Sequence, residues 1–146
     1  MTVHMIKLCV GADSIEDLAQ WQEGRLAAQK AAGQKPQLFH KTRMVPKRQA
    51  ELLDGGSLYW VIKGVIQVRQ RIIGFGEGQK PDGTPCCLIL LDRKLVPTHP
   101  VPRRAFQGWR YLEPADVPPD LDARTSQQLA QLPSEMRKEL AELGLI

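Results

Sequence analysis

The residues best suited to chemistry lie in the middle of the chain, where basic and aromatic side chains occur together. Between Lys35 and Arg71 the sequence has eight lysines and arginines against only Glu51 and Asp54. Seven of the eight aromatic residues fall between positions 39 and 111. Cations neutralise phosphates and release condensed counterions, while flat rings stack on bases. This mixture predicts a surface that binds RNA or a modified nucleotide.

The residues expected on this surface divide into phosphate-contacting cations and stacking rings. Arginine offers a planar fork that matches a phosphate, whereas lysine acts as a point charge. Tyr59 and Trp60 are neighbours in an expected strand and must point to opposite faces, so we expect one in the core and the other exposed for stacking. A solvated basic face is the alternative interpretation of the cations. The predicted nucleic-acid-binding residues are Arg43, Lys47, Arg48, Tyr59, Trp60, Lys63, Arg69, Arg103, Arg104, Trp109 and Arg110.

Two other functions are compatible with the sequence. A small hydrolase acting on a nucleoside-type substrate would use Lys63 to activate Thr42 or a water, with Glu51 or Glu77 moving protons. Acidic residues are scarce in this part of the chain, which weighs against that hypothesis. A non-catalytic interaction subunit would use the basic face to bind an acidic protein. The sequence does not decide whether the protein is an enzyme.

Length and composition indicate one ordinary domain. A chain of 146 residues can bury a core without disulfide or metal support, and 42% hydrophobic with 25% charged residues is typical of globular proteins. The formal net charge of +4 hides an acidic C-terminal region after Leu112, so the body is more basic than the total suggests. No apolar run approaches the roughly 18 residues of a membrane span, and the N-terminus lacks signal-peptide features. We therefore expect a cytoplasmic protein without a membrane partner.

The cysteines and histidines do not follow the spacing of a metal site. The three cysteines are Cys9, Cys86 and Cys87, and we expect all of them to be free thiols, with Cys9 in the core. The three histidines are scattered along the chain, so no metal is expected. The glycines at 55–56 lack the Walker spacing, and we expect no cofactor. The sequence makes no prediction about oligomeric state.

Hydrophobic periodicity predicts a mixture of strands and helices. A buried strand over residues 3–10 is followed by a helix that begins near Asp13 and ends by Gly33. Glycines and prolines over residues 76–83 indicate a loop, after which the chain returns as an antiparallel strand. Three prolines make residues 97–102 extended and irregular. The remaining predicted elements are strands at 37–42, 57–63, 65–73 and 86–91, and helices at 46–53 and 134–143, the last closed by Gly144.

Four segments carry a resemblance to a known family. Residues 1–11, 42–48, 55–64 and 106–111 together resemble a family of short, functionally uncharacterised proteobacterial proteins known only as a domain of unknown function. The resemblance runs from Met1 to about Leu121. It implies no activity that could be transferred to this chain.

A more distant resemblance concerns the strand of sequence Tyr-Trp-Val-Ile-Lys that follows a Gly-Gly turn. It is similar to the PUA-like superfamily, which includes the PUA, ASCH, EVE and YTH domains. That resemblance implies an α+β fold, a mixed-strand pseudobarrel flanked by helices, and binding of RNA or modified bases. The hydrolase alternative would correspond to the ASCH-type amidohydrolases. We accordingly expect a single PUA-like domain over residues 1–121 and a C-terminal helical extension over residues 122–146.

Overall fold

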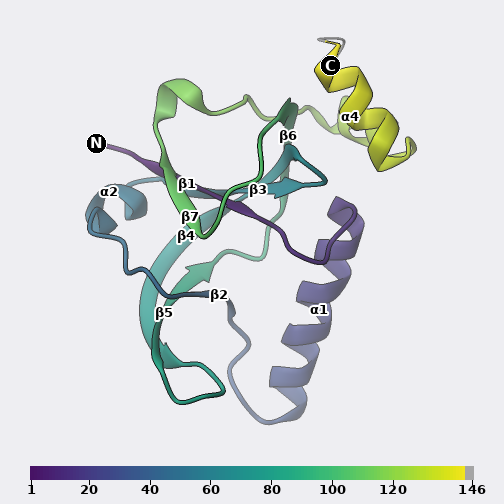
Figure 1. Cartoon of the computed structure of the whole chain (residues 1–146). Coiled ribbons are helices and arrows are strands. Elements are labelled where there is room, and N and C mark those ends of the chain that lie inside the picture. The colour runs from purple at the N-terminus through teal and green to yellow at the C-terminus, as the bar shows by residue number, and fades with distance from the viewer. Residues whose placement is uncertain (144–146) are drawn as a thin grey trace.

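The sheet is built around β3 (Ser57–Ile62), a strand whose six residues are all buried. Its sequence, Ser-Leu-Tyr-Trp-Val-Ile, is rich in the aromatic and β-branched residues that favour strands. β1 (His4–Leu8) pairs with it in parallel on one side, and β4 (Val65–Gln79) pairs antiparallel on the other. The computed structural model, shown in Figure 1, describes residues 1–143, except for the side chains of residues 123, 126, 129, 130 and 134.

The long strand β4 joins two parts of the sheet. Its first half also pairs with β6 (Val96–Pro102), and its second half pairs with β5 (Pro85–Leu91). β2 (Leu38–Thr42) lies outside β5, and β7 (Trp109–Leu112) lies outside β1. The resulting order is β2-β5-β4-β3-β1-β7, with β6 paired to β4.

Glycines explain why β4 extends through a segment that the sequence predicts to be a loop. A Cβ at Gly78 would lie 2.9 Å from Leu88 Cδ2, and a Cβ at Gly74 would lie 3.2 Å from Leu90 Cδ1. The missing side chains therefore leave room for the β5 leucines to cross the β4 backbone. The loop prediction for residues 76–83 is wrong up to Gln79, and the turn itself is confined to residues 80–84.

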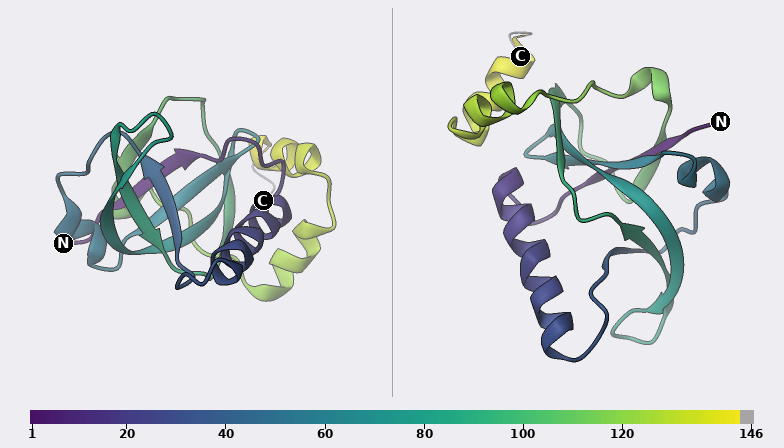
Figure 2. Two further views of the ribbon diagram at one scale, coloured as in Figure 1. Left: turned by 90° about the horizontal axis from the view of Figure 1, so that it is seen from below. Right: turned by 180° about the vertical axis from the view of Figure 1, so that it is seen from behind.

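The α+β class is confirmed, but the described strands form an open sheet. β2 and β7 are its two ends and do not pair with each other within residues 1–143. The sheet curves strongly, as the two further views in Figure 2 show. The predicted mixed sheet with flanking helices is therefore present. The predicted pseudobarrel is not, because the sheet does not close into a barrel within the described residues.

The two faces of the sheet carry separate hydrophobic clusters. The face covered by α1 (Ile15–Ala31), here called the α1 face, buries Met5, Trp60 and Trp109 together with Leu18 of the helix. The opposite face buries a smaller cluster that includes Ile6 and Tyr59, against which Phe106 and Val117 pack. β3 is thus covered on both sides.

The helices agree with the sequence in part. α1 begins one residue later than predicted, because Ser14 and not Asp13 is the N-cap, with its Oγ accepting a hydrogen bond of 3.1 Å from the Asp17 backbone N–H. The helix predicted at 46–53 is the shorter α2 (Gln49–Leu53). Residues 97–102 are not irregular but belong to β6. Within residues 1–143, every helix is too short or too polar to cross a membrane.

The C-terminal region contains one helix that the sequence indicates and two short elements that it does not. A 3₁₀ helix over Pro114–Asp116 follows β7, and α3 (Ala123–Ala130) precedes α4 (Ser134–Glu142). α4 packs near β6, as Figure 1 shows. The predicted helix stop at Gly144 lies outside the described residues.

A buried amide pair fastens α1 to the sheet. Gln22 of α1 and Gln70 of β4 exchange two hydrogen bonds of 2.8 and 2.9 Å. The same Gln70 amide accepts from Trp60 Nε1 at 2.9 Å and donates to the Asp92 carbonyl at 3.0 Å. A satisfied buried network of this kind fixes one orientation of the packed elements.

We predict that Gln22→Ala lowers the free energy of unfolding by about 1–3 kcal/mol, because the Gln70 amide loses a buried partner. Gln20→Ala is the matched control, since Gln20 is an exposed glutamine of the same helix, and we expect a change within about 0.5 kcal/mol. Urea unfolding followed by tryptophan fluorescence would measure both. Equal effects of the two substitutions would contradict a role for the amide pair.

Candidate functional site

The three aromatic residues predicted to stack on bases are buried. Tyr59, Trp60 and Trp109 are 3%, 3% and 4% exposed. The expectation that one of Tyr59 and Trp60 faces solvent is wrong, because both faces of β3 are covered by protein. In this structure these rings therefore do not form an exposed stacking platform.

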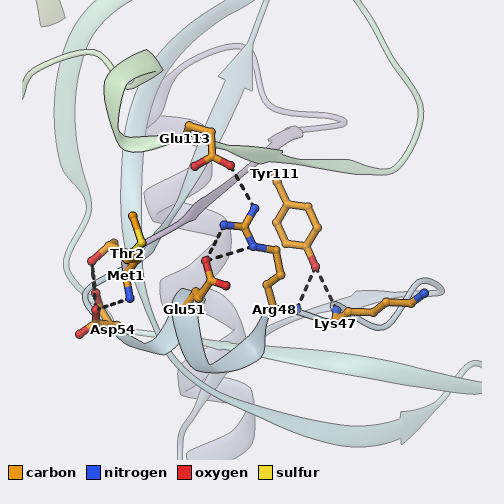
Figure 3. Close-up of polar contacts among 8 residues, drawn as sticks. All are labelled: Met1, Thr2, Lys47, Arg48, Glu51, Asp54, Tyr111 and Glu113. Atoms are coloured by element: carbon orange, nitrogen blue, oxygen red, sulfur yellow. Dashed lines mark hydrogen bonds and ion pairs between the residues drawn. The ribbon is translucent and has the colours of Figure 1, made fainter.

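Two aromatic side chains of β7 hold the segment between β2 and α2. Trp109 donates from Nε1 to the Met44 carbonyl at 3.0 Å. The Tyr111 hydroxyl accepts hydrogen bonds from the backbone N–H groups of Lys47 and Arg48, at 3.0 and 3.1 Å. Figure 3 shows this hydroxyl pointing at the two backbone nitrogens while the Lys47 side chain extends away. The segment that carries the predicted cations is thus fixed by the core.

Arg48 is neutralised by carboxylates. Its guanidinium binds Glu51 through two nitrogens and Glu113 through a third, the latter at 3.0 Å, and lies 5.2 Å from the centre of the Tyr111 ring. Figure 3 shows Arg48 between the two acids. These hydrogen bonds lower the pKa of Glu51. Arg48 therefore joins α2 to the end of β7.

Two more predicted phosphate ligands are ion-paired. Arg69 makes a bidentate pair with Asp120 at 2.8 and 2.7 Å and donates to Ser57 Oγ at 3.0 Å. This pairing lowers the pKa of Asp120. Lys63 lies in the turn between β3 and β4 with a φ of 54°, and its Nζ is 3.2 Å from Asp13 Oδ1.

The other predicted cations have no carboxylate partner within residues 1–143. Arg110 donates to the backbone carbonyls of Gln107 and Trp109, at 2.9 and 3.1 Å, which carry no formal charge. All of these residues are exposed. The exposed cations without a described carboxylate are Arg43, Lys47, Arg103, Arg104 and Arg110.

Arg43 lines a pocket between the end of β2 and the hairpin of β4 and β5. The pocket has a volume of about 490 Å³, and Glu77, Gln79 and Cys86 contribute to its other walls. A smaller neighbouring pocket of about 240 Å³ shares Glu77 and Cys86 and adds Cys87. One guanidinium, one carboxylate and one amide thus line a space that could hold a polar ligand. Burial raises the pKa of the Cys87 thiol.

One arrangement of the hydrolase hypothesis, activation of Thr42 by Lys63, does not fit the described positions of these two residues. Lys63 pairs with Asp13 at the turn after β3, whereas Thr42 ends β2, and β5 and β4 separate these two strands in the sheet. Across residues 1–143 there is also no group of three or more histidine, cysteine or acidic side chains placed to hold a metal ion.

The structure identifies two residues that the sequence does not single out, Lys7 and His40. Lys7 lies on the α1 face of β1, directly between Trp60 and Trp109 in the strand registers. His40 of β2 contacts the edge of Trp60, with ring centroids 5.4 Å apart, and its buried Nε2 has no hydrogen-bond partner in the described part of the chain. The sequence feature that could have drawn attention to Lys7 is its position in a mostly apolar strand, on the same side as Met5 and Cys9.

Burial makes His40 an acid-sensitive element of the fold. Burial, together with the nearby positive charges of Lys7 and Arg25, lowers the pKa of His40 to about 4. The unfolded chain, with a histidine pKa near 6.5, therefore binds a proton that the folded protein rejects. This difference favours unfolding as the pH falls from about 6.5 towards 4, and it contributes nothing at higher pH.

Between pH 6.5 and pH 4, protonation of His40 in the unfolded chain lowers the free energy of unfolding of the wild type by up to about 3 kcal/mol. We predict that His40→Phe, which cannot titrate, does not show this part of the loss. Urea unfolding at a series of pH values would measure this. His99→Phe is the control, because His99 is exposed, and its pH profile should match that of the wild type. A His40→Phe profile parallel to the wild type would show that His40 protonates freely in the folded state.

Comparison with known proteins gives one finding. Residues 5–146 match the model of a family described as "Protein of unknown function (DUF1489)". The match extends beyond Leu121, where the resemblance read from the sequence ends, and includes α3 and α4. Neither a curated protein nor a solved structure matches the chain significantly. Because the family model covers nearly the whole sequence, the chain belongs to this family of proteins of unknown function.

Proposed function

We propose that the protein binds RNA or a nucleotide by contacting phosphate at the Arg43 pocket. The observation that carries this proposal is an exposed arginine, without a carboxylate partner among the described residues, on the wall of a pocket of about 490 Å³. That volume lies in the range of small-molecule sites, roughly 300–1,000 Å³. A guanidinium matches phosphate oxygens with two parallel hydrogen bonds.

The fixed backbone around Arg43 supports the proposal. Trp109 binds the Met44 carbonyl next to Arg43, and Tyr111 binds the backbone N–H groups of Lys47 and Arg48. A segment held in this way loses little conformational freedom when a ligand binds. Lys47 extends from the same segment and adds a second positive charge.

The remaining pocket walls offer groups for recognising a base. The Glu77 carboxylate can accept hydrogen bonds from N–H groups on a base edge, and the Gln79 amide can donate and accept. Tyr59, Trp60 and Trp109 are buried, so the proposal assigns them no stacking role. Affinity would therefore come mainly from phosphate contacts. The more distant resemblance to PUA-like domains, which forms part of this proposal, favours the same class of ligand.

We predict that labelled single-stranded RNA binds the protein with an affinity that falls as salt rises, and that Arg43→Gln reduces the slope of the logarithmic salt plot by about 0.7, the value for one phosphate contact. Fluorescence polarisation across a salt series would measure this. Arg93→Gln is the matched control, because Arg93 is an exposed arginine outside the Arg43 pocket.

Two outcomes would contradict the proposed site. Absence of binding at low salt would remove the nucleic-acid function altogether. Equal losses with Arg43→Gln and Arg93→Gln would show that binding depends on total charge and not on the pocket. Single nucleotides should be tested in the same assay, because the pocket would accept them as well as a longer strand.

We predict a different effect for Tyr111→Phe. This substitution removes the acceptor for two backbone N–H groups, which costs about 1 kcal/mol per hydrogen bond, and it loosens the segment without removing a charge. Affinity for RNA should fall while the slope of the salt plot stays that of the wild type. A changed slope, or an unchanged affinity, would show that the Tyr111 hydroxyl does not position the cations.

A further inference from the structure

Lys7 occupies an unusual position for a lysine, in the row of side chains that crosses the middle of the sheet. β1 lies between β3 and β7, and the registers place Lys7 opposite Trp60 on one side and opposite Trp109 on the other. Both tryptophans belong to the buried cluster of the α1 face. The lysine side chain therefore leaves the backbone between two indole rings and is itself partly buried.

The two tryptophans beside Lys7 offer its amine no hydrogen-bond acceptor. The indole N–H of Trp60 is bonded to Gln70, and that of Trp109 is bonded to the Met44 carbonyl, so the polar edges of both rings are used elsewhere. Lys7 itself makes no ion pair with residues 1–143. An ammonium group in such a place loses hydration without gaining a counter-ion.

The titratable groups near Lys7 do not compensate for this loss. Cys9 lies on the same face of β1, and burial raises the pKa of its thiol to about 11, so it is uncharged at neutral pH. His40 faces the site from β2 and is neutral because its pKa is about 4, while Arg25 of α1 is a cation and brings no negative charge. Burial lowers the pKa of Lys7, with only the Cys9 thiol opposing it.

Three other lysines of the body have ordinary surroundings. Lys63 is paired with Asp13, Lys41 donates to the Gln79 carbonyl at 3.1 Å, and the exposed Lys47 side chain points away from its neighbours in Figure 3. Lysines that act as nucleophiles are those withdrawn from water into apolar surroundings, because more of the amine is then unprotonated at neutral pH. Among these four lysines, Lys7 alone fits that description.

We propose that Lys7 is a nucleophilic amine that captures a small aldehyde or ketone as an imine. The nitrogen lone pair adds to the carbonyl carbon, the carbonyl oxygen takes up a proton as the amine loses one, and the resulting carbinolamine expels water to leave the C=N bond. One water molecule is released, and neither an oxidant nor a reductant is needed. The site differs from the Arg43 pocket and does not depend on nucleic-acid binding.

The test measures the reaction of individual lysines in the wild-type protein. Propanal is added at pH 7, the imines are trapped with cyanoborohydride, and peptide mass spectrometry with fragmentation separates Lys7 from the Met1 amine. We expect Lys7 to be modified at least about fivefold faster than Lys47, its exposed control. Across a pH series, the modification of Lys7 should level off at a lower pH than that of Lys47.

Equal rates and equal pH profiles for Lys7 and Lys47 would overturn the proposal, as would a Lys7 that stays unmodified at every pH. Lys7→Arg keeps the positive charge but forms no imine, and should abolish the fast phase. Lys47→Arg is the matched variant and should leave that phase intact. If Lys7→Arg failed to fold, the comparison within the wild-type protein would still decide.

Discussion

Burial of β3 on both faces is the constraint on which the rest of the structure depends. A strand of Ser-Leu-Tyr-Trp-Val-Ile with protein on each side must place its aromatic rings in the core, and the buried polar atoms of such rings require partners. Trp60 finds Gln70, which in turn binds Gln22 of α1. β7, on the far side of β1, repeats the arrangement with Trp109, which binds the Met44 carbonyl. Core aromatics thereby position both α1 and the loop that carries Arg43.

Local patterns in the sequence were sufficient for much of the fold. Apolar residues on both sides of the segment at 3–10 correctly indicated a buried strand, the segment at 57–63 was correctly predicted to be a strand, and residues 86–91 paired antiparallel as expected. The errors arose where tertiary contacts overrule local preference. The glycines of β4 are typical of a loop, yet they provide space for Leu88 and Leu90 of the paired strand. A single sequence does not show that pairing.

The candidate site was harder to predict because charge pairing is not local. Arg48 and Arg69 looked like free phosphate ligands, but Asp120 binds Arg69 from 51 residues later in the chain, and Glu113 binds Arg48, which also pairs with the nearby Glu51, from 65 residues later. A count of basic residues in the sequence includes such arginines as possible phosphate ligands, although carboxylates of the folded protein already neutralise them. Arg43 is exposed, which its predicted phosphate-binding role requires, but no sequence pattern shows that it lines a pocket. Lys7 escaped notice because a single lysine in an apolar strand usually reaches solvent.

The acidic C-terminal region therefore has a role beyond balancing the net charge of +4. Glu113 binds Arg48 beside α2, and Asp120 binds Arg69 of β4. Each acid thus connects the C-terminal region to the body of the protein. Ion pairs of partly exposed groups contribute little to stability, but they determine which positive charges remain uncompensated. With Arg48 and Arg69 paired, the field at the surface is set by cations such as Arg43 and Arg103. An anionic ligand would then be directed to the Arg43 pocket by charges that the fold has selected, and not by the basic composition as a whole.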